Sequence, residues 1–277
     1  MKRTKLKSSA SNKSTAEILG RGWVLLQLGA LVLTYNEENV IEECMESLSW
    51  VDEIVVVDSY SDDDTLEICN DYTRKIYQRE FDDFSSQRNY GLEKIESDWI
   101  LILDADERIP GVLAEEVKNL LNNDGDFPVY KIPRKNFFLG SWIKHCGWYP
   151  DYTIRLFKNS DELRYEGEVH EDLTYEGECG RLENPLIHLT YSNLDDYVSK
   201  INHYTSLEIE KSSRNINLIQ VILRPKIEFI KKYFLQKGFL DGSAGLILCM
   251  LSAINKFLKY AKLWEAKKKF YFNDNHE

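Results

Sequence analysis

The chain has 277 residues, a formal net charge of -11 at pH 7, and hydrophobic residues at 43% of the total. This apolar content excludes a disordered or collagen-like chain, and the acidic balance excludes a protein whose main role is to wrap nucleic acid, since that requires positive charge to replace counterions. Residues 1–23 and 224–277 are nevertheless basic, which leaves the body between them strongly acidic. The basic ends suit anionic surfaces, and the acidic body suits metal or cationic chemistry.

Apolar runs alternate with helical patterns through the first half of the sequence. Runs rich in Val, Ile and Leu predict strands at residues 30–34, 53–58, 75–77 and 99–104. Helical patterns lie between and after them, at residues 36–48, 64–72, 85–96 and 110–121. Asn36 is the expected cap of the first helix. Buried strands separated by helices are typical of an α/β fold, here a Rossmann-like, mostly parallel sheet with helices on both faces.

Polar residues follow three of the predicted strands at the point where each strand ends. The three segments are Thr34-Tyr35-Asn36-Glu37, Asp58-Ser59 and Asp104-Ala105-Asp106-Glu107. Ligands of open α/β sheets bind beyond the carboxyl ends of the strands. We therefore expect the ligand site at this edge, although a single Asp after a strand could equally cap the next helix.

The first of these segments contains no glycine, which argues against a dinucleotide fingerprint and against a phosphate-binding P-loop. Phosphates would then be held by a metal and by side chains. Asp104 and Asp106 stand two residues apart in an extended segment, so both carboxylates face the same cleft. Mg²⁺ prefers one or two carboxylates with water and phosphate oxygens in its remaining positions, so the pair suits a nucleotide diphosphate.

Several motifs in this order resemble glycosyltransferase family 2, whose members have the GT-A fold. The motifs in the first half are Leu33-Thr34-Tyr35-Asn36-Glu37-Glu38, Val56-Val57-Asp58-Ser59, Gln87-Arg88-Asn89 and Leu103-Asp104-Ala105-Asp106-Glu107. Three looser motifs, Arg155-Leu156-Phe157, Glu168-Val169-His170-Glu171 and Phe239-Leu240-Asp241-Gly242, resemble the bacterial subgroup that includes lipopolysaccharide-core β-glucosyltransferases. The loop at 60–64 is bulkier than is usual in the family.

The resemblance implies a role for each residue of the first half. Thr34, Tyr35 and Glu37 would line the uracil and ribose pocket. Ser59 would join the same nucleotide-sugar site, and Asp58 would accept a hydrogen bond from the base or ribose. Each has an ordinary alternative, because Glu37 could favour a helix N-terminus and Asp58 could cap a helix.

The resemblance also implies the groups that meet the diphosphate. Arg88 would approach the base or the diphosphate, unless it is a solvated helix residue. Asp104 would lie near the ribose and the metal, and Asp106 would be the principal ligand of Mg²⁺ or Mn²⁺. The metal would neutralise charge on the leaving nucleoside diphosphate.

Inverting sugar transfer also needs a base to take the proton of the acceptor hydroxyl. We expect it in the second half, with Glu171 favoured and Asp151 second; a surface carboxylate is the alternative for each. Glu168, His170 and Arg155 are possible contacts to the acceptor or to phosphate, although His170 could be a structural hydrogen-bonding group. Aromatic residues at 137–149 could stack on a sugar or simply pack in the core.

The C-terminal region has helical periodicity, with an apolar stripe and an interleaved set of lysines. Basic amphipathic helices suit an anionic leaflet, and packing on the catalytic domain is the alternative. No stretch is expected to reach the about 18 apolar residues of a spanning helix. Five widely separated cysteines predict reduced thiols. We thus expect a cytoplasmic protein, peripheral at the cytoplasmic face of the membrane.

Together these patterns predict a metal-dependent inverting glycosyltransferase. UDP-glucose is the favoured donor, and the expected acceptor is a lipid-linked or cell-envelope glycan such as lipopolysaccharide core. The alternatives are a haloacid-dehalogenase-like phosphatase and a noncatalytic relative that binds nucleotide sugar or membrane. The expected parts are a basic, disordered arm at 1–23, a nucleotide-sugar-binding half at 24–125, an acceptor-side half at 126–195 and an amphipathic basic helical region at 196–277.

Overall fold

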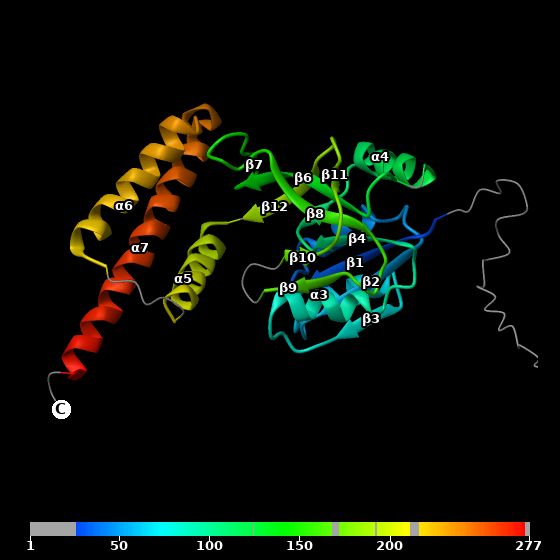
Figure 1. Cartoon of the computed structure of the whole chain (residues 1–277), viewed down its shortest axis with the longest axis horizontal. Helices are drawn as coiled ribbons and strands as arrows, with labels where there is room; N and C mark the ends of the chain where they lie inside the picture. Colours follow the sequence, from blue (N-terminus) through cyan, green and yellow to red (C-terminus); the bar gives the residue numbers. More distant parts are fainter. Residues whose placement is uncertain (1–25, 124, 168–171, 192, 211–215, 275–277) are drawn as a thin grey trace, which may run out of the picture.

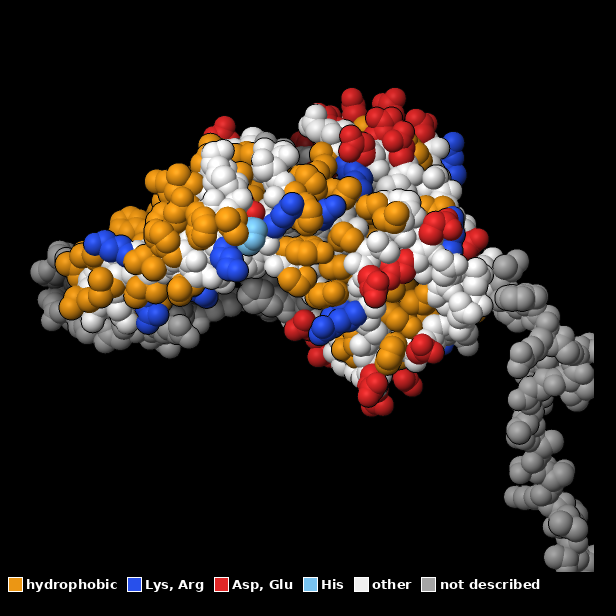
Figure 2. All heavy atoms as spheres, turned by 90° about the horizontal axis from the view of Figure 1, so that it is seen from above, with side chains coloured by type: hydrophobic (Ala, Val, Ile, Leu, Met, Phe, Trp, Pro, Cys, Tyr) orange, Lys and Arg blue, Asp and Glu red, His pale blue; other side chains and the backbone are white. Residues whose placement is uncertain are grey.

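An α/β body carries a helical region that extends from one end of its sheet (Figure 1). The computed structural model describes residues 26–123, 125–167, 172–191, 193–210 and 216–274. Acidic side chains gather over the α/β body, whereas apolar and basic side chains cover the helical region on the face seen in Figure 2. The predicted fold class, a mostly parallel sheet with helices and a C-terminal helical region, is confirmed.

Four parallel strands form the first half of the sheet in the order β3-β2-β1-β4. They are β1 (Leu28–Thr34), β2 (Glu53–Asp58), β3 (Lys75–Gln78) and β4 (Trp99–Asp104). Thr34 is paired with Asp58, and Leu33 is paired with Asp104. The ends of these three strands therefore meet at one edge, as the sequence predicts.

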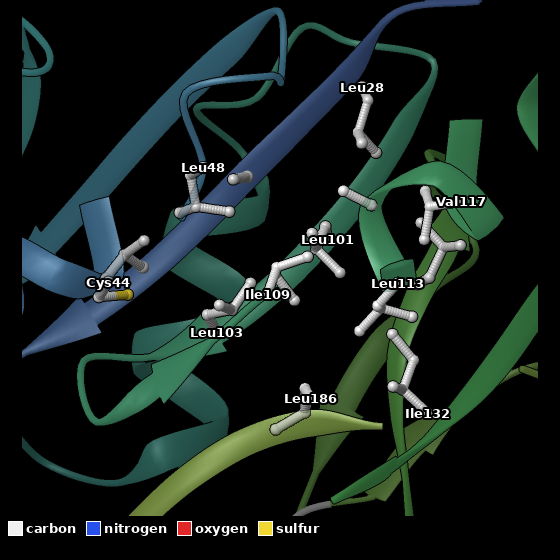
Figure 3. Packing of buried hydrophobic residues seen from close by; sticks show 14 of the residues in the cluster. Leu28, Cys44, Leu48, Leu101, Leu103, Ile109, Leu113, Val117, Ile132 and Leu186 are labelled. Atoms are coloured by element: carbon white, nitrogen blue, oxygen red, sulfur yellow. The ribbon is translucent and has the colours of Figure 1, made fainter. Parts of the chain in front are cut away.

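Alternate side chains of the strands enter two hydrophobic cores. Val32 points to the face covered by α1 (Ile41–Glu46), α2 (Thr65–Asn70) and α4 (Gly111–Asn122). Figure 3 shows this core, in which Leu101 and Leu103 of β4 lie among the helix side chains. Leu31 points to the opposite face, which is covered by α3 (Phe84–Leu92) and by the hairpin of β9 (Arg164–Glu166) and β10 (Asp172–Thr174).

The sheet continues without a break into the second half of the chain. β8 (Asp151–Lys158) pairs antiparallel with β4, and β6 (Val129–Phe138) pairs antiparallel with β8. β12 (Leu186–Tyr191) runs parallel to β6 and pairs with the two-residue β5 (Glu107–Arg108). The short strands β7 (Ser141–Trp142) and β11 (Cys179–Arg181) flank β6. The β5–β12 pair brings His188 opposite Glu107, directly after the Asp104–Asp106 segment.

The helix expected at 36–48 begins later and is shorter. Asn36 has a φ of 53°, in the left-handed region, so it does not cap a helix. Its backbone N–H donates to Ser61 Oγ at 2.9 Å, and its side-chain amide donates to Asp62 at 2.7 Å. The chain turns toward the neighbouring loop before α1 starts, because these contacts compete with helix formation.

The helical region comprises α5 (Leu194–Glu210), α6 (Leu218–Ile230), a π-helical turn (Lys231–Leu235), a 3₁₀ turn (Gly238–Asp241) and the long α7 (Gly242–Asp274). A buried cluster containing Phe138, Tyr197 and Leu248 joins it to the sheet. Residues 238–266 are long and apolar enough to cross a membrane by length and composition. We expected no stretch of this length, and that expectation was wrong. It required an unbroken apolar run, whereas residues 238–266 are apolar on average although isolated lysines interrupt them.

Candidate active site

Two loops form one rim of the site beyond the carboxyl ends of β1 and β2. Glu37 N–H donates to Thr65 Oγ1 at 2.8 Å, and Glu38 N–H donates to Asp63 at 3.1 Å. Glu38 in turn accepts a hydrogen bond from Asp64 N–H. These bonds fix the backbone of Thr34–Glu38 against the bulky 60–64 loop, which provides a preformed rim of the kind that ligand sites use.

The predicted nucleotide-binding residues lie at this rim with very different exposure. Tyr35 is exposed, whereas Thr34 is buried and its Oγ1 has no hydrogen-bond partner among the described residues. Asp58 is fully buried and accepts hydrogen bonds from Ser61 Oγ, Ser61 N–H and Gln78. Ser59 Oγ accepts from Gln87 Nε2 at 2.8 Å. Asp58 thus holds the loop that follows it, and its contact with a base stays a prediction.

Asp104 lies between two buried arginines. Arg88 Nη2 is 3.1 Å from Asp104 Oδ1, and Arg155 Nη2 is 2.5 Å from Asp104 Oδ2. Burial opposes ionisation of Asp104, but Arg155 and Arg88 outweigh it and hold the pKa of this carboxyl well below its usual range. Both oxygens contact protein cations, but the side chain is 32% exposed and each oxygen has a further lone pair, so a contact of Asp104 with ribose or metal stays a prediction.

Arg155 also contacts Glu107, a residue that the sequence analysis did not assign to the site. Arg155 Nη2 lies 2.8 Å from Glu107 Oε1, and the Glu107 carboxylate accepts from Asp104 N–H at 3.2 Å. Burial would lower the pKa of Arg155, but Asp104 and Glu107 raise it above its ordinary value. Because Arg155 is 3% exposed, it lies beneath the cleft rather than on the open surface that an acceptor contact would require. Arg88 is similarly buried and is not a solvated helix residue.

Asp106 differs from Asp104 in its surroundings. Its Oδ1 is buried and has no hydrogen-bond partner among the described residues, and its Oδ2 lies 3.4 Å from His188 Nε2. Burial lowers the pKa of His188, but Asp106 outweighs it and raises the pKa above the ordinary value. An orphaned carboxylate oxygen beside an imidazole fits a divalent cation.

No group of three or more His, Cys, Asp or Glu side chains in the described part of the chain could hold a metal alone. Ligand and water oxygens would have to complete the coordination shell around Asp106. His188 is the second candidate protein ligand. Sequence reasoning missed it because a lone His within an apolar strand, 82 residues after Asp106, gives no signal of its own.

Asp151 lies at the start of β8, beside the same cleft. Its Oδ2 accepts from Arg134 Nη2 at 2.7 Å and from Asn136 Nδ2 at 3.1 Å. Asn136 also contacts His188 Nδ1 at 2.7 Å, so the Asp151 and Asp106 groups belong to one polar network. The other predicted second-half residues, Glu168, His170 and Glu171, lie outside the described residues.

Two adjoining hollows occupy this edge of the sheet. One, of about 470 Å³, is lined by Asn36, Glu37, Asp106, Thr190, Tyr191 and Lys200, among others. The second, of about 250 Å³, shares Thr190 and is lined by Arg134, Asn136, Asp151 and His188. A larger hollow of about 650 Å³ lies at the amino-terminal edge of the strands, beside Asp52 and Lys75. The carboxyl edge contains Asp106, whose buried Oδ1 has no hydrogen-bond partner in the part of the chain that the structure describes, so we place the site there.

Known proteins resemble this chain in sequence. A family model described as Glycosyl transferase family 2 matches residues 30–170. The lipopolysaccharide core biosynthesis glycosyltransferase LpsC of Rhizobium meliloti is 28% identical and covers 87% of this chain and 93% of its own length. An uncharacterized glycosyltransferase of Rickettsia felis is 24% identical, with 87% and 90% coverage.

Among solved structures, residues 1–349 of S. aureus TarS in complex with UDP-GlcNAc align with a TM-score of 0.45 and 16% identity, over 88% of this chain and 92% of that one. In a longer TarS structure this chain spans 45% of the length.

Proposed function

The chain belongs to glycosyltransferase family 2, and on that premise we propose that it transfers glucose or a closely related sugar from a nucleotide diphosphate to a lipid-linked or envelope glycan. The reaction would depend on Mg²⁺ or Mn²⁺, and UDP-glucose is the favoured donor. Family membership sets aside the phosphatase alternative, and the similarity to glycosyltransferases along nearly the whole chain supports an enzyme rather than a noncatalytic relative.

The observation that carries the proposal is the contrast between the two carboxylates of the Asp104–Asp106 pair. Asp104 is neutralised inside the fold by Arg88 and Arg155, whereas Asp106 Oδ1 is buried without a partner among the described residues. A buried carboxylate oxygen without a partner is costly unless a cation or a hydrogen-bond donor meets it. A divalent cation held by Asp106, with His188 beside it, would neutralise charge on the leaving diphosphate.

The protein side chains supply positioning. The ion-paired cluster of Asp104, Glu107 and Arg155 fixes the end of β4, so Asp106 is held without the reorganisation that a flexible loop would need. Asn36 and Glu37 of the loop at 34–38 line the hollow of about 470 Å³ together with Asp106. Thr34, Tyr35 and Glu37 are proposed to contact the nucleoside here.

Asp151 is the proposed base among the described residues. In the inverting reaction the acceptor oxygen attacks the anomeric carbon, the carbon–oxygen bond to the diphosphate breaks, and the acceptor proton moves to the base. Arg134 and Asn136 hold Asp151 Oδ2, and the side chain is 34% exposed, so an acceptor hydroxyl can reach it. Glu171 remains the other candidate. Asp151→Asn and Glu171→Gln separate them, since only loss of the base should abolish transfer while donor binding persists.

The proposed acceptor class rests on the similarity to LpsC, a lipopolysaccharide core biosynthesis glycosyltransferase. We propose a core or other lipid-linked glycan for this chain as well. The test is incubation with Mn²⁺, a panel of nucleotide sugars, and truncated lipopolysaccharide acceptors. We expect one nucleotide sugar to be consumed in a metal-dependent manner, and product to form on a core acceptor.

The matched control for this test compares Asp106→Ala with Glu115→Ala, an exposed carboxylate on α4. Only Asp106→Ala should abolish turnover. Equal activity in the presence of a chelator would remove the metal from the proposal. Absence of turnover with every nucleotide sugar, by protein that folds normally, would contradict the proposed donor class.

A further inference from the structure

The outer surface of the α6–α7 hairpin is apolar along most of its length. On α6 and the turns that follow, the exposed apolar side chains are Leu218, Ile219, Ile222, Leu223, Ile227, Ile230, Phe234, Leu235, Phe239 and Leu240. On α7 they are Leu246, Ile247, Met250, Ile254 and Phe257, at helical spacing on one face. Soluble monomers rarely expose apolar area of this extent, so the surface marks an interaction site.

The polar contacts of this region point inward, toward the rest of the protein. Lys262 Nζ lies within 2.8 Å of four oxygen atoms of α5, contributed by Asn202, Thr205 and Ser206. At the other end of the apolar run, Asp241 accepts from His145 N–H and contacts His145 Nδ1 at 2.8 Å. α7 is thus attached to the protein by these polar contacts and by the buried Leu248 and Cys249, while a second set of large apolar side chains faces outward.

The positive charge of the α6–α7 region favours an anionic partner. Between Leu218 and Glu265 the sequence has eight Lys and Arg residues against three Asp and Glu. Arg224, Lys226 and Lys231 are exposed beside the apolar residues of α6. Figure 2 shows basic side chains among the apolar ones at this end of the molecule. Apolar side chains bordered by lysines are complementary to acyl chains beneath anionic headgroups.

We propose that this face of the α6–α7 hairpin lies in one leaflet of an anionic bilayer, with its apolar side chains among the upper acyl chains. The lysines would meet the headgroups, since their long stems allow the charge to reach the interface. The inference stands apart from the sugar-transfer chemistry, because it rests on the helical region alone.

The polar contacts at the two ends of the apolar segment, Asp241 in the 3₁₀ turn and Lys262 on α7, decide between lying on the membrane and crossing it. Asp241 and Lys262 are separated by about 30 Å along a helix, close to the thickness of a bilayer core. Both are bonded to other parts of the same protein, namely the loop at His145 and α5. Crossing would pull one of these contacts away from its partner, so α7 lies alongside the bilayer despite its span-like composition.

The test is flotation of the full chain with phosphatidylcholine vesicles, with and without phosphatidylglycerol. We expect binding that is strongest with phosphatidylglycerol and that persists in part at high salt, where the screening length falls to about 3 Å at 1 M. The double variant Ile227→Gln/Ile254→Gln should reduce binding about tenfold or more. The transfer of these two side chains from water to the acyl chains would no longer be favourable in free energy. Lys226→Gln/Lys231→Gln should reduce only the preference for the anionic lipid.

Val112→Gln is the matched control, since Val112 is 63% exposed on α4, away from this face. All variants are first checked for an unchanged melting temperature. Undiminished binding by the Ile227→Gln/Ile254→Gln variant, or complete release of the wild type by salt, would overturn the proposal. The proposal would also be overturned if the wild type self-associated without binding vesicles and the Ile227→Gln/Ile254→Gln variant abolished that self-association. The face would then join two copies of the chain. Retention in cell membranes after alkaline carbonate extraction would contradict the one-leaflet placement.

Discussion

Arg155 Nη2 lies 2.5 Å from Asp104 Oδ2, and the other oxygen of Asp104 accepts from Arg88. The carboxylate that we expected beside the metal is therefore paired with two buried arginines, although its side chain is 32% exposed. Its neighbour Asp106 lines the cleft, and the buried Oδ1 of Asp106 has no hydrogen-bond partner among the described residues. The two carboxylates share a short motif but have different environments, which leads to a direct prediction.

Asp104→Asn and Asp106→Asn should have separable effects. Asp104→Asn removes a carboxylate that contacts two buried arginines, so we expect the free energy of unfolding to fall by about 2 kcal/mol, moderated by Glu107, which still pairs with Arg155. Asp106→Asn removes no internal ion pair with an arginine, and its effect on stability should stay within about 1 kcal/mol. Urea titration measures both. Equal destabilisation by the two substitutions would contradict the assigned roles.

α3 packs so closely on β1 that there is no free space for a side chain at Gly91. A β-carbon at Gly91 would overlap the side chain of Leu31, whereas a β-carbon at Gly111 would meet nothing within 4 Å. We expect Gly91→Ala to destabilise the protein by about 1–3 kcal/mol through overpacking. Gly111→Ala, in the first turn of α4, should be neutral or stabilising. Thermal unfolding of the pair provides the comparison, and a neutral Gly91→Ala would show that α3 is not seated as described.

Glu53 lies at the amino-terminal edge of the sheet, and its ionisation makes the free energy of unfolding depend on pH. Burial opposes ionisation of Glu53, but hydrogen bonds from Lys75 and Ser97 outweigh it and lower the pKa in the folded protein. The unfolded chain then binds the proton more tightly, so the stabilisation is present above about pH 4.3 and is lost as the pH falls through the folded-state pKa.

Glu53→Gln should therefore lower the free energy of unfolding at pH 7 and have a smaller effect at pH 3. Denaturant titrations at the two pH values measure the difference. A variant that is equally destabilised at both would show that Glu53 contributes through packing alone. Glu162→Gln, at an exposed carboxylate without a resolved ion pair in the described structure, is the control.

The five cysteines should differ in reactivity toward a thiol reagent. Burial raises the pKa of Cys69 to about 12, and it raises that of Cys146 to about 12. Cys44 and Cys249 are also buried, whereas Cys179 is partly exposed. We expect one thiol to react quickly in the native protein, and Cys179→Ser to remove that reaction. Rapid labelling of several thiols would indicate opening of the cores.

The central strands could be predicted from the sequence, and the strands at 53–58 and 99–104 occur with the expected bounds. Their apolar runs are uninterrupted, which indicates strands that are buried on both faces of the sheet. Asn36 could not be predicted, because its left-handed conformation depends on hydrogen bonds with residues 25 and 26 positions away. His188 joins Asp106 only through the β5–β12 pairing, a contact between distant segments that no local pattern encodes.

The C-terminal helices illustrate a different limit. Periodicity identified an apolar stripe on α7 but could not tell whether it faces the protein or its surroundings. The packing shows apolar side chains on both sides of the helix, since Leu248 and Cys249 are buried against the protein and Met250 and Ile254 are exposed. The spacing of Leu, Ile and Lys is the same for either orientation, so only the packing partner distinguishes them.

Metal-dependent nucleotide binding at Asp106 underlies the proposed sugar transfer. Calorimetric titration of UDP should give measurable binding with Mn²⁺ and much weaker binding in chelator. Asp106→Ala should lose the metal-dependent part, while Glu115→Ala retains it. Binding of UDP that is equally strong without metal, or that survives Asp106→Ala unchanged, would contradict the central claim.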